Sequence, residues 1–380
     1  MRARELLTRL VSFDTTSSRS NSEILDYLGG HARSLGFEIK IDTITDEKGV
    51  EKGNLVCTAG PKPGRGPGGA GLAFVGHTDC VPYDADWKDA LNLVERDGRL
   101  FARGAADTKG FIAAAIAAVE GLDLARLTRP LTLAFTHDEE IGCLGAKRLS
   151  ADRALSASYA IVGEPTSLTP IRAHKGYCIA EVQIHGREGH SAYPDLGINA
   201  IFNAARLLTR IEGISLALKT ETDETFTPPY TTVNVGKIEG GKAKNIIPGS
   251  CRFVVEWRPI PGQNPEAVYD RLADAAEALH REDRRFECEL ELSRSDVGAS
   301  TSPDSALVKF LEEATGKKSE TVSFGTEAPQ MAELGAEPVI CGPGDIKVAH
   351  RTGEFVPVLE LSRAVDLYAS AIKRFCIQDA

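Results

Sequence analysis

Residues 110–137 read GFIAAAIAAVEGLDLARLTRPLTLAFTH, an apolar stretch of helical length followed by a short apolar run that begins at Pro130. The first half is rich in alanine, a strong helix former, and the second half has the length of a strand buried on both faces. Further apolar runs of strand length occur at 53–60, 71–77 and 157–164. This alternation of helices and buried strands predicts an α/β/α sandwich with a mostly parallel central sheet.

The pattern changes after residue 177. Residues 178–292 contain, in order, a strand, a helix, two strands, a helix and a strand, which is the order of the split, ferredoxin-like α+β arrangement. From residue 293 onward the chain returns to alternating helices and strands. We therefore expect a larger, discontinuous α/β domain formed by 1–177 and 293–380, with a smaller domain, 178–292, inserted into it.

Composition narrows the class of protein. A chain of 380 residues suits two domains, and its net charge of -10, without a basic run, argues against a nucleic-acid partner. No apolar run approaches the ~20 residues needed to cross a membrane, and the N-terminal residues MRARELLTRLVSF are typical of a helix and not of a signal peptide. The eight cysteines form no C-x-x-C pair, so we expect neither a disulfide framework nor a cysteine zinc site. A reducing, cytoplasmic location fits this pattern.

One apparent motif is interpreted as a turn. Gly64, Gly66 and Gly69 match G-x-G-x-x-G, but a dinucleotide site needs this pattern to open a helix. Here Pro67 interrupts the pattern and a strand follows it. The stretch 60–71 is therefore predicted to be a surface loop.

Charged and imidazole side chains follow the apolar strands. His77 and Asp79 lie two residues apart at the end of the strand 71–77, so they point to the same side. The segment 137–140, HDEE, ends the next strand, where four ionisable groups are costly unless they have a function. Taken separately, the segment with His77 and Asp79 could be a turn with a chance histidine, and the segment 137–140 could be a solvated loop.

Three further residues extend this pattern. Asp107 lies between glycines before the helix that begins near residue 110, where capping of that helix is an alternative role. Glu164 ends a buried strand, and His350 follows the glycine-rich turn at 342–345. Two histidines and at least three carboxylates at strand ends suit zinc, cobalt or manganese. Two ions ~3.5–4 Å apart would need about this many ligands and a bridging group.

Taken in order, these fragments resemble the M20 family of metal-dependent aminoacylases and carboxypeptidases, and the resemblance extends over nearly the whole chain. The fragments that carry it are GHTDCVP (76–82), GAADTKG (104–110), DEEIG (138–142), VGEPTS (162–167), GHSAYP (189–194) and AH (349–350). Each fragment alone is unspecific, whereas their combination and order are highly specific.

The resemblance implies a cofactor of two divalent metal ions, Zn²⁺ first and Co²⁺ as an alternative. It implies that His77 and Glu164 bind one ion, that Glu140 and His350 bind the other, and that Asp107 bridges both. The larger domain would thus be the metal-binding domain.

The same resemblance implies the catalytic roles. Glu139 would be the general base, and Asp79 would support the neighbouring metal ligand. His190, in the inserted domain, would stabilise the developing oxyanion. The inserted domain would act as a lid and would form a homodimer, and the peptide bond between Asp107 and Thr108 would be cis.

The implied reaction is hydrolysis of the N-acyl amide of an N-acyl amino acid, a small-molecule substrate. Within the family, the segments 164–176, 324–329 and 342–350 are most similar to enzymes of arginine biosynthesis that act on N2-acetyl-L-ornithine. The residues that match the family's substrate contacts, together with a carboxylate that could favour a cationic side chain, are Lys175, Asn245, Arg258, Thr326 and Glu327. Capping of a helix is an alternative role for Glu327.

Several alternatives remain open at this point. Related deacylases that act on acetylcitrulline or succinyl-diaminopimelate, a general aminoacylase and a metallo-carboxypeptidase would share the fold and the metals. A binding protein without activity would not need Glu139. A cysteine hydrolase using Cys80 or Cys143 lacks a persuasive histidine partner.

Overall fold

The computed structural model describes residues 2–64 and 69–377, and the chain divides into two compact units. The larger unit comprises Met1–Arg172, Ser300–Glu320 and Thr326–Ala380, and the smaller unit comprises Ala173–Ala299 and Thr321–Gly325. Gly66 and Pro67, on which the interpretation of the G-x-G-x-x-G match depends, lie outside the described residues.

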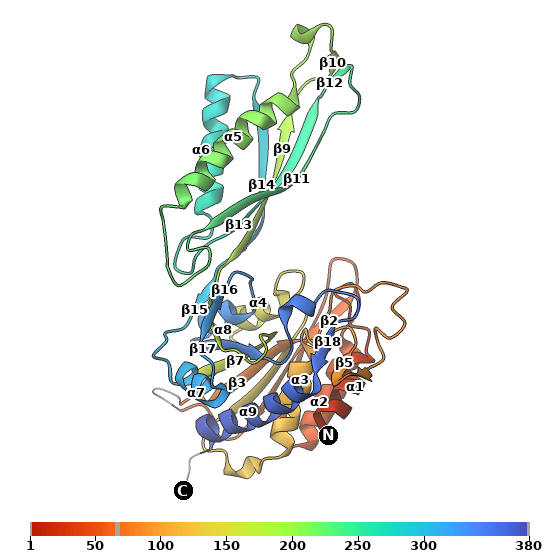
Figure 1. The fold of residues 1–380 in the computed structure, drawn as a ribbon, viewed down its shortest axis with the longest axis vertical. Helices are drawn as coiled ribbons and strands as arrows, with labels where there is room; N and C mark the ends of the chain where they lie inside the picture. The colour runs from red at the N-terminus through yellow and green to blue at the C-terminus, as the bar shows by residue number, and fades with distance from the viewer. Residues whose placement is uncertain (1, 65–68, 378–380) are drawn as a thin grey trace. The chain divides into compact units, whose positions relative to one another are not determined.

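Nine strands of the described chain form one mixed sheet in the order β1-β2-β6-β3-β7-β17-β8-β15, with β16 paired to β8 (Figure 1). The neighbouring pairs β6–β3, β3–β7 and β7–β17 are parallel, whereas β1 and β2 are antiparallel additions at one side. The strands are β1 Glu38–Thr45, β2 Glu51–Ala59, β3 Leu72–His77, β6 Leu131–Thr136, β7 Tyr159–Pro165, β8 Ile171–His174, β15 Ala299–Ser300, β16 Glu320–Val322 and β17 Glu337–Gly342. The predicted α/β class with a mostly parallel centre is confirmed.

Helices cover both faces of this sheet in the larger unit. One face carries the main apolar core, to which five helices contribute: α1 Arg2–Val11, α2 Ser22–Ser34, α3 Lys109–Glu120, α7 Ala306–Thr315 and α9 Val358–Cys376. The other face carries the shorter helices α4 Leu144–Ala151 and α8 Ala328–Glu333. A small sheet in the order β18-β5-β4 completes the unit, with β4 Val94–Arg96, β5 Arg99–Phe101 and β18 Phe355–Pro357.

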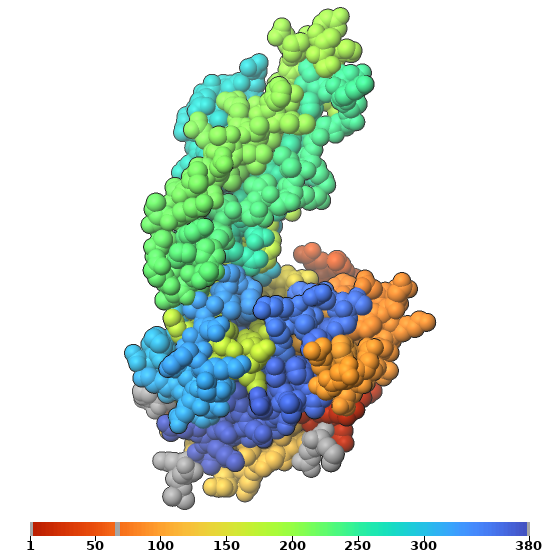
Figure 2. Space-filling view, in the orientation of Figure 1, coloured from red at the N-terminus to blue at the C-terminus, as the bar shows by residue number. Residues whose placement is uncertain are grey.

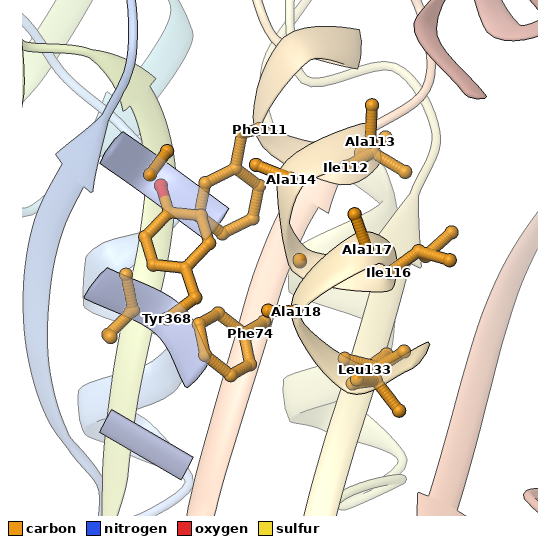
Figure 3. Close-up of a cluster of buried hydrophobic side chains, with 14 of the residues drawn as sticks. Phe74, Phe111, Ile112, Ala113, Ala114, Ile116, Ala117, Ala118, Leu133 and Tyr368 are labelled. Carbon is orange, nitrogen blue, oxygen red and sulfur yellow. The ribbon is translucent and has the colours of Figure 1, made fainter. Parts of the chain in front are cut away.

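Three aromatic rings lie at the centre of the main core (Figure 3). Phe74 of β3, Phe111 of α3 and Tyr368 of α9 have ring centroids 5.2 to 6.2 Å apart, and the Tyr368 hydroxyl donates a hydrogen bond of 2.9 Å to the Cys341 carbonyl. A Cβ atom built on Gly163 would lie 2.3 Å from the Phe111 ring, and one on Gly76 would lie 2.9 Å from it. Each of these glycines directly precedes a predicted metal ligand, so close packing of α3 on the sheet fixes the strand ends that carry the site.

Gly163→Ala is therefore expected to destabilise the larger unit. The added methyl group would overlap Phe111, and overpacking of this kind costs about 1–3 kcal/mol in the free energy of unfolding. Urea unfolding of the variant and the wild type measures the difference.

Gly30→Ala is the matched control, because Gly30 lies in α2 with open space around its Cβ position. The same substitution there should stabilise the helix by up to about 1 kcal/mol. Equal stability of the wild type and Gly163→Ala would contradict the packing argument.

The smaller unit has the predicted order β-α-β-β-α-β. Its four-stranded antiparallel sheet runs β11-β13-β9-β14, and α5 and α6 cover one face of it with a second apolar core. The elements are β9 Tyr177–His185, α5 Ala200–Leu218, β11 Thr232–Gly240, β13 Ser250–Arg258, α6 Ala267–Glu282 and β14 Glu287–Asp296, with a short antiparallel pair of strands, β10 Gly189–His190 and β12 Ile246–Ile247. No helix among the described residues has the length and apolar composition needed to cross a membrane.

Candidate metal centre and active site

The candidate site begins where three adjacent parallel strands end. β3 lies between β6 and β7, and His77 pairs with Thr136 in the register of β3 and β6. Glu139 and Glu140 follow β6, and Glu164 lies near the end of β7. Because the strands are parallel, their carboxyl ends meet at the same edge of the sheet. The fold therefore brings together side chains that lie far apart in the sequence.

Asp107 is the centre of this cluster. Its Oδ1 lies 3.1 Å from Nε2 of His77, and its Oδ2 lies 3.1 Å from Nε2 of His350. The peptide bond from Asp107 to Thr108 is cis, as the family resemblance implied. A carboxylate whose two oxygens face different histidines has the arrangement that a bridging ligand needs.

His350 completes the second half of the cluster. Its backbone is left-handed, with φ of 59°, and its Nε2 lies 3.0 Å from Oε2 of Glu140. Among the described residues, two groups of side chains bring three possible ligand atoms within 4.8 Å of one another. These groups are His77, Glu139 and Glu164, and His77, Asp107 and Glu140. Imidazole and carboxylate together suit zinc and its neighbours in the first transition row, so this donor set fits the implied cations.

Asp79 orients the turn that carries the two glutamates. Its Oδ1 accepts a hydrogen bond of 3.0 Å from the Glu139 amide, and its Oδ2 accepts one of 2.8 Å from the Ser17 hydroxyl. The backbone carbonyl of Asp79 lies 2.9 Å from Nδ1 of His77. A histidine held through Nδ1 presents Nε2 to a metal, which is the usual arrangement behind a metal ligand.

Burial and like charge dominate the electrostatics of the cluster. Burial, with the charge of Glu140 added, raises the pKa of Glu139 to about 8. Burial also raises the pKa of Glu164 well above its usual range, with the charges of Asp107 and Glu139 contributing. Buried carboxylates that repel one another are stabilised by bound cations, which supply the missing positive charge.

Several supporting residues were not expected from the sequence. Lys52, buried in β2, donates a hydrogen bond of 2.8 Å to Oδ1 of Asp138, which precedes Glu139 and has a left-handed backbone with φ of 53°. The same ammonium group donates to the carbonyls of Ser17 and Arg19 at 2.6 and 2.8 Å. A lysine within an otherwise buried strand was the available signal, but its partner lies 86 positions away.

A second support lies behind Asp107. Oε1 of Glu354 accepts hydrogen bonds from the amides of Ala106 and Asp107 at 2.9 and 3.1 Å, and Arg103 pairs with Oε2 of Glu354 at 2.6 Å. This buried pair fixes the loop before α3, and nothing in the local sequence around Glu354 indicated it.

Thr326 and Glu327, predicted to contact the substrate, directly precede α8 in the larger unit. The Thr326 hydroxyl accepts a hydrogen bond of 3.1 Å from the Ala328 amide, whereas the Glu327 side chain makes no capping bond. Glu327 is buried, burial raises its pKa to about 7, and its Oε1 has no hydrogen-bond partner among the described residues. The alternative role of Glu327 as a helix cap is therefore not supported.

Lys175, another predicted substrate contact, is buried in the smaller unit. Its ammonium group donates hydrogen bonds of 2.7 and 2.6 Å to the carbonyls of Pro228 and Tyr230. These bonds tie the connection between β8 and β9 to the loop at 228–230. A contact between Lys175 and the substrate stays a prediction.

His190 and Asn245, also in the smaller unit, lie close together where the short strands β10 and β12 pair. The Ser191 amide donates a hydrogen bond of 3.1 Å to the Asn245 carbonyl, and the Ala192 amide donates one of 3.1 Å to Nδ1 of His190. Arg258, the remaining predicted contact, ends β13 of the same unit. The predicted roles of these residues stay predictions.

The geometry does not favour a cysteine nucleophile. Cys80 is buried, and burial raises the pKa of its thiol, whereas a nucleophilic cysteine needs a lowered pKa. The Cys143 thiol donates a hydrogen bond of 3.4 Å to Oε1 of Glu139, so it faces a carboxyl group and not the imidazole base that a nucleophilic cysteine needs.

Comparison with known proteins gives four informative matches. The model of peptidase family M20/M25/M40 matches residues 73–374. The chain is 55% identical over 374 residues to an acetylornithine deacetylase of Myxococcus xanthus, covering 98% of this chain and 97% of that protein. Its fold is similar to that of a Staphylococcus aureus tripeptidase, with a TM-score of 0.80, 24% identity and 98% of each chain covered. It is also similar to an M20 family metallo-carboxypeptidase of Sulfolobus solfataricus, with a TM-score of 0.79, 19% identity and 99% of each chain covered.

Proposed function

Since the chain belongs to peptidase family M20/M25/M40, we propose that it is a metal-dependent amidohydrolase that removes the acetyl group from N2-acetyl-L-ornithine. The observation that carries this proposal is the approach of Asp107 to His77 on one side and to His350 on the other. The identity of 55% with an acetylornithine deacetylase supports the choice of substrate.

The proposed cofactor is two divalent cations, Zn²⁺ in the first place and Co²⁺ as the alternative. His77 and Glu164 would hold one, Glu140 and His350 the other, and Asp107 would bridge them. When bound, such cations activate water near neutral pH and polarise the amide carbonyl. The mixed imidazole and carboxylate donors support this assignment.

Glu139 is the proposed general base, and Asp79 holds it in place through the bond to its amide. Its carboxylate takes a proton from the attacking water and delivers it to the leaving amine.

Substrate binding is assigned to the residues that match the family's substrate contacts. The guanidinium group of Arg258 would bind the α-carboxylate, for which its fork of donors is suited, with Lys175, Asn245 and Thr326 as further contacts. Glu327 would favour the cationic side chain of ornithine. The unpartnered carboxylate oxygen of Glu327 in a buried position supports that role.

The substrate proposal predicts a clear preference. The kcat/KM for N2-acetyl-L-ornithine should exceed that for N-succinyl-diaminopimelate by roughly tenfold or more, because a buried carboxylate attracts the lone ammonium group of the ornithine side chain and repels the additional carboxylates of succinyl-diaminopimelate. Initial rates with both substrates and with N-acetylcitrulline, in the presence of added Zn²⁺ or Co²⁺, measure it.

Glu327→Gln is the matched control, since it keeps the shape of the side chain and removes its charge. This variant should lose the preference for acetylornithine over the neutral acetylcitrulline. Comparable or reversed rates in the wild type would assign the chain to a related deacylase.

We also propose a homodimer that forms through the smaller unit, and a reducing, cytoplasmic location. The helix α5 lies at the surface of that unit (Figure 2). Phe202 in this helix is 71% exposed, and Leu196, which lies shortly before the helix, is 65% exposed. Exposed apolar side chains of this size are typical of a protein–protein interface. All eight cysteines are free, which suits a reducing compartment.

A further inference from the structure

Tyr177 lies between two arginines on the sheet of the smaller unit. The Cζ atom of Arg258 is 3.7 Å from the centroid of the Tyr177 ring, and the Cζ atom of Arg294 is 4.5 Å from it. Both distances lie within the range of cation–π interactions. The three side chains therefore form a stack, which we call the Arg–Tyr–Arg stack.

The order of the strands places one arginine on each side of the ring. Tyr177 begins β9, which lies between β13 and β14 in the sheet. Trp257 of β13 pairs with Cys178, so the next residue, Arg258, is level with Tyr177. On the other side, Asp296 of β14 pairs directly with Tyr177.

A β-bulge in β14 is responsible for the position of Arg294. The register of β14 against β9 shifts between Leu292 and Arg294, so that Ser293 is an extra residue. In an unbroken register Arg294 would pair with Cys178, which is buried in the core beneath α5 and α6. One extra residue reverses the faces of a strand, so the bulge turns Arg294 onto the uncovered face that carries Tyr177.

Each guanidinium group in the stack is also held at its Nε atom. The Nε of Arg258 donates a hydrogen bond of 3.0 Å to Oε1 of Glu256, and that of Arg294 donates to Asp296. Among the described residues, the terminal nitrogens of Arg258 have no hydrogen-bond partner. The plane of this guanidinium group is thus fixed by the ring and by Glu256, while its two outer donors stay available for a carboxylate.

We propose that Tyr177 is a positioning residue that holds Arg258 ready for the α-carboxylate of the substrate, with Arg294 packing against the same ring. This inference rests on the proposed role of Arg258. Tyr177 itself does not contact the substrate. Its contribution is preorganisation, because a guanidinium group that is already oriented loses less freedom when the carboxylate binds.

The test compares KM and kcat for N2-acetyl-L-ornithine and for its α-carboxamide, which lacks the carboxylate. Tyr177→Leu should raise KM for the acid by about tenfold, the size of a cation–π contact of moderate strength, and change kcat by less than about threefold. KM for the carboxamide should stay unchanged. Tyr177→Phe keeps the aromatic ring, so its KM for the acid should stay close to that of the wild type.

Tyr269→Leu is the matched control for damage to the smaller unit, because Tyr269 packs between α6 and β14 on the helix-covered side. It should lower the stability of the unit without a selective rise in KM for the acid. A double variant shows whether Tyr177 acts through Arg258. Once Arg258→Met has raised KM, adding Tyr177→Leu should raise it no further.

The outcomes separate this inference from the proposed function. If Arg258→Met raises KM for the acid but Tyr177→Leu does not, the positioning role is wrong and the assignment of Arg258 stands. If Tyr177→Leu raises KM equally for the acid and the carboxamide, its effect is merely structural and the positioning role is again wrong. An unchanged KM in Arg258→Met would overturn the assignment of Arg258 and, with it, the positioning role.

Discussion

Replacing Glu139 with glutamine is expected to lower kcat by ~10² or more while both metal ions stay bound. The amide keeps the shape of the side chain but cannot accept a proton from water. Steady-state kinetics and metal analysis of the purified variant measure the two effects separately. Full activity with the metals retained would show that Glu139 is not the base.

Metal content is the important measurement, because the geometry permits a second role. The possible ligand atoms of Glu139, His77 and Glu164 lie within 4.8 Å of one another, so Glu139 could itself bind a cation. In that case Glu139→Gln would lose metal together with activity. Glu140→Ala is the matched comparison. Glu140 lies 3.0 Å from the presumed ligand His350, and its loss should weaken metal binding directly.

The main features of the fold and the cluster could be predicted because their signals are local. Each parallel strand is a short apolar run, and His77 and Glu164 lie at the ends of such runs. The rule that parallel strands end at the same edge then brings their side chains together without knowledge of any contact. The ferredoxin-like order of the smaller unit followed from the same kind of local pattern.

The supporting contacts could not be predicted, because they depend on pairs of residues that lie far apart. Glu354 binds the amides of Ala106 and Asp107 across about 250 positions of sequence. Lys52 is apparent in the sequence as a lysine, but the burial of its ammonium group against Asp138 is a property of the folded chain. The bulge at Ser293 is a similar case, since period-2 patterns do not reveal a one-residue shift.

Lys175 shows that a residue's chemical type does not fix its partners in the folded chain. A lysine suits a substrate carboxylate, and its position matched the family's contact. Its ammonium group is nevertheless buried and bonded to the carbonyls of Pro228 and Tyr230. Sequence patterns identify a donor, whereas the fold decides which acceptors are nearby.

Replacing His190 with alanine is expected to lower kcat by ~10²–10³, the usual cost of removing one donor to an oxyanion. The Ala192 amide donates to Nδ1 of His190, so the neutral ring carries its proton on Nε2. That proton is free to be donated, because His190 lies exposed in the β10–β12 strand pair. The ring centroids of His190 and Tyr193 are 5.8 Å apart. If the His190 ring only packed against Tyr193, its removal would not change kcat.

We further expect His190 to act in the active site of the second subunit of the proposed homodimer, and complementation tests this. His190→Ala and Glu139→Ala subunits, each inactive as homodimers, are mixed under conditions that exchange subunits. A mixed dimer has one site in which Glu139 comes from one chain and His190 from the other, so activity should reappear in that site.

Size-exclusion chromatography with differently tagged subunits establishes that mixed dimers form. If they form and stay inactive, His190 acts within its own chain or has no catalytic role. A KM for N2-acetyl-L-ornithine close to the wild-type value in the restored site would show that the exchanged histidine serves the reaction and not the binding of substrate.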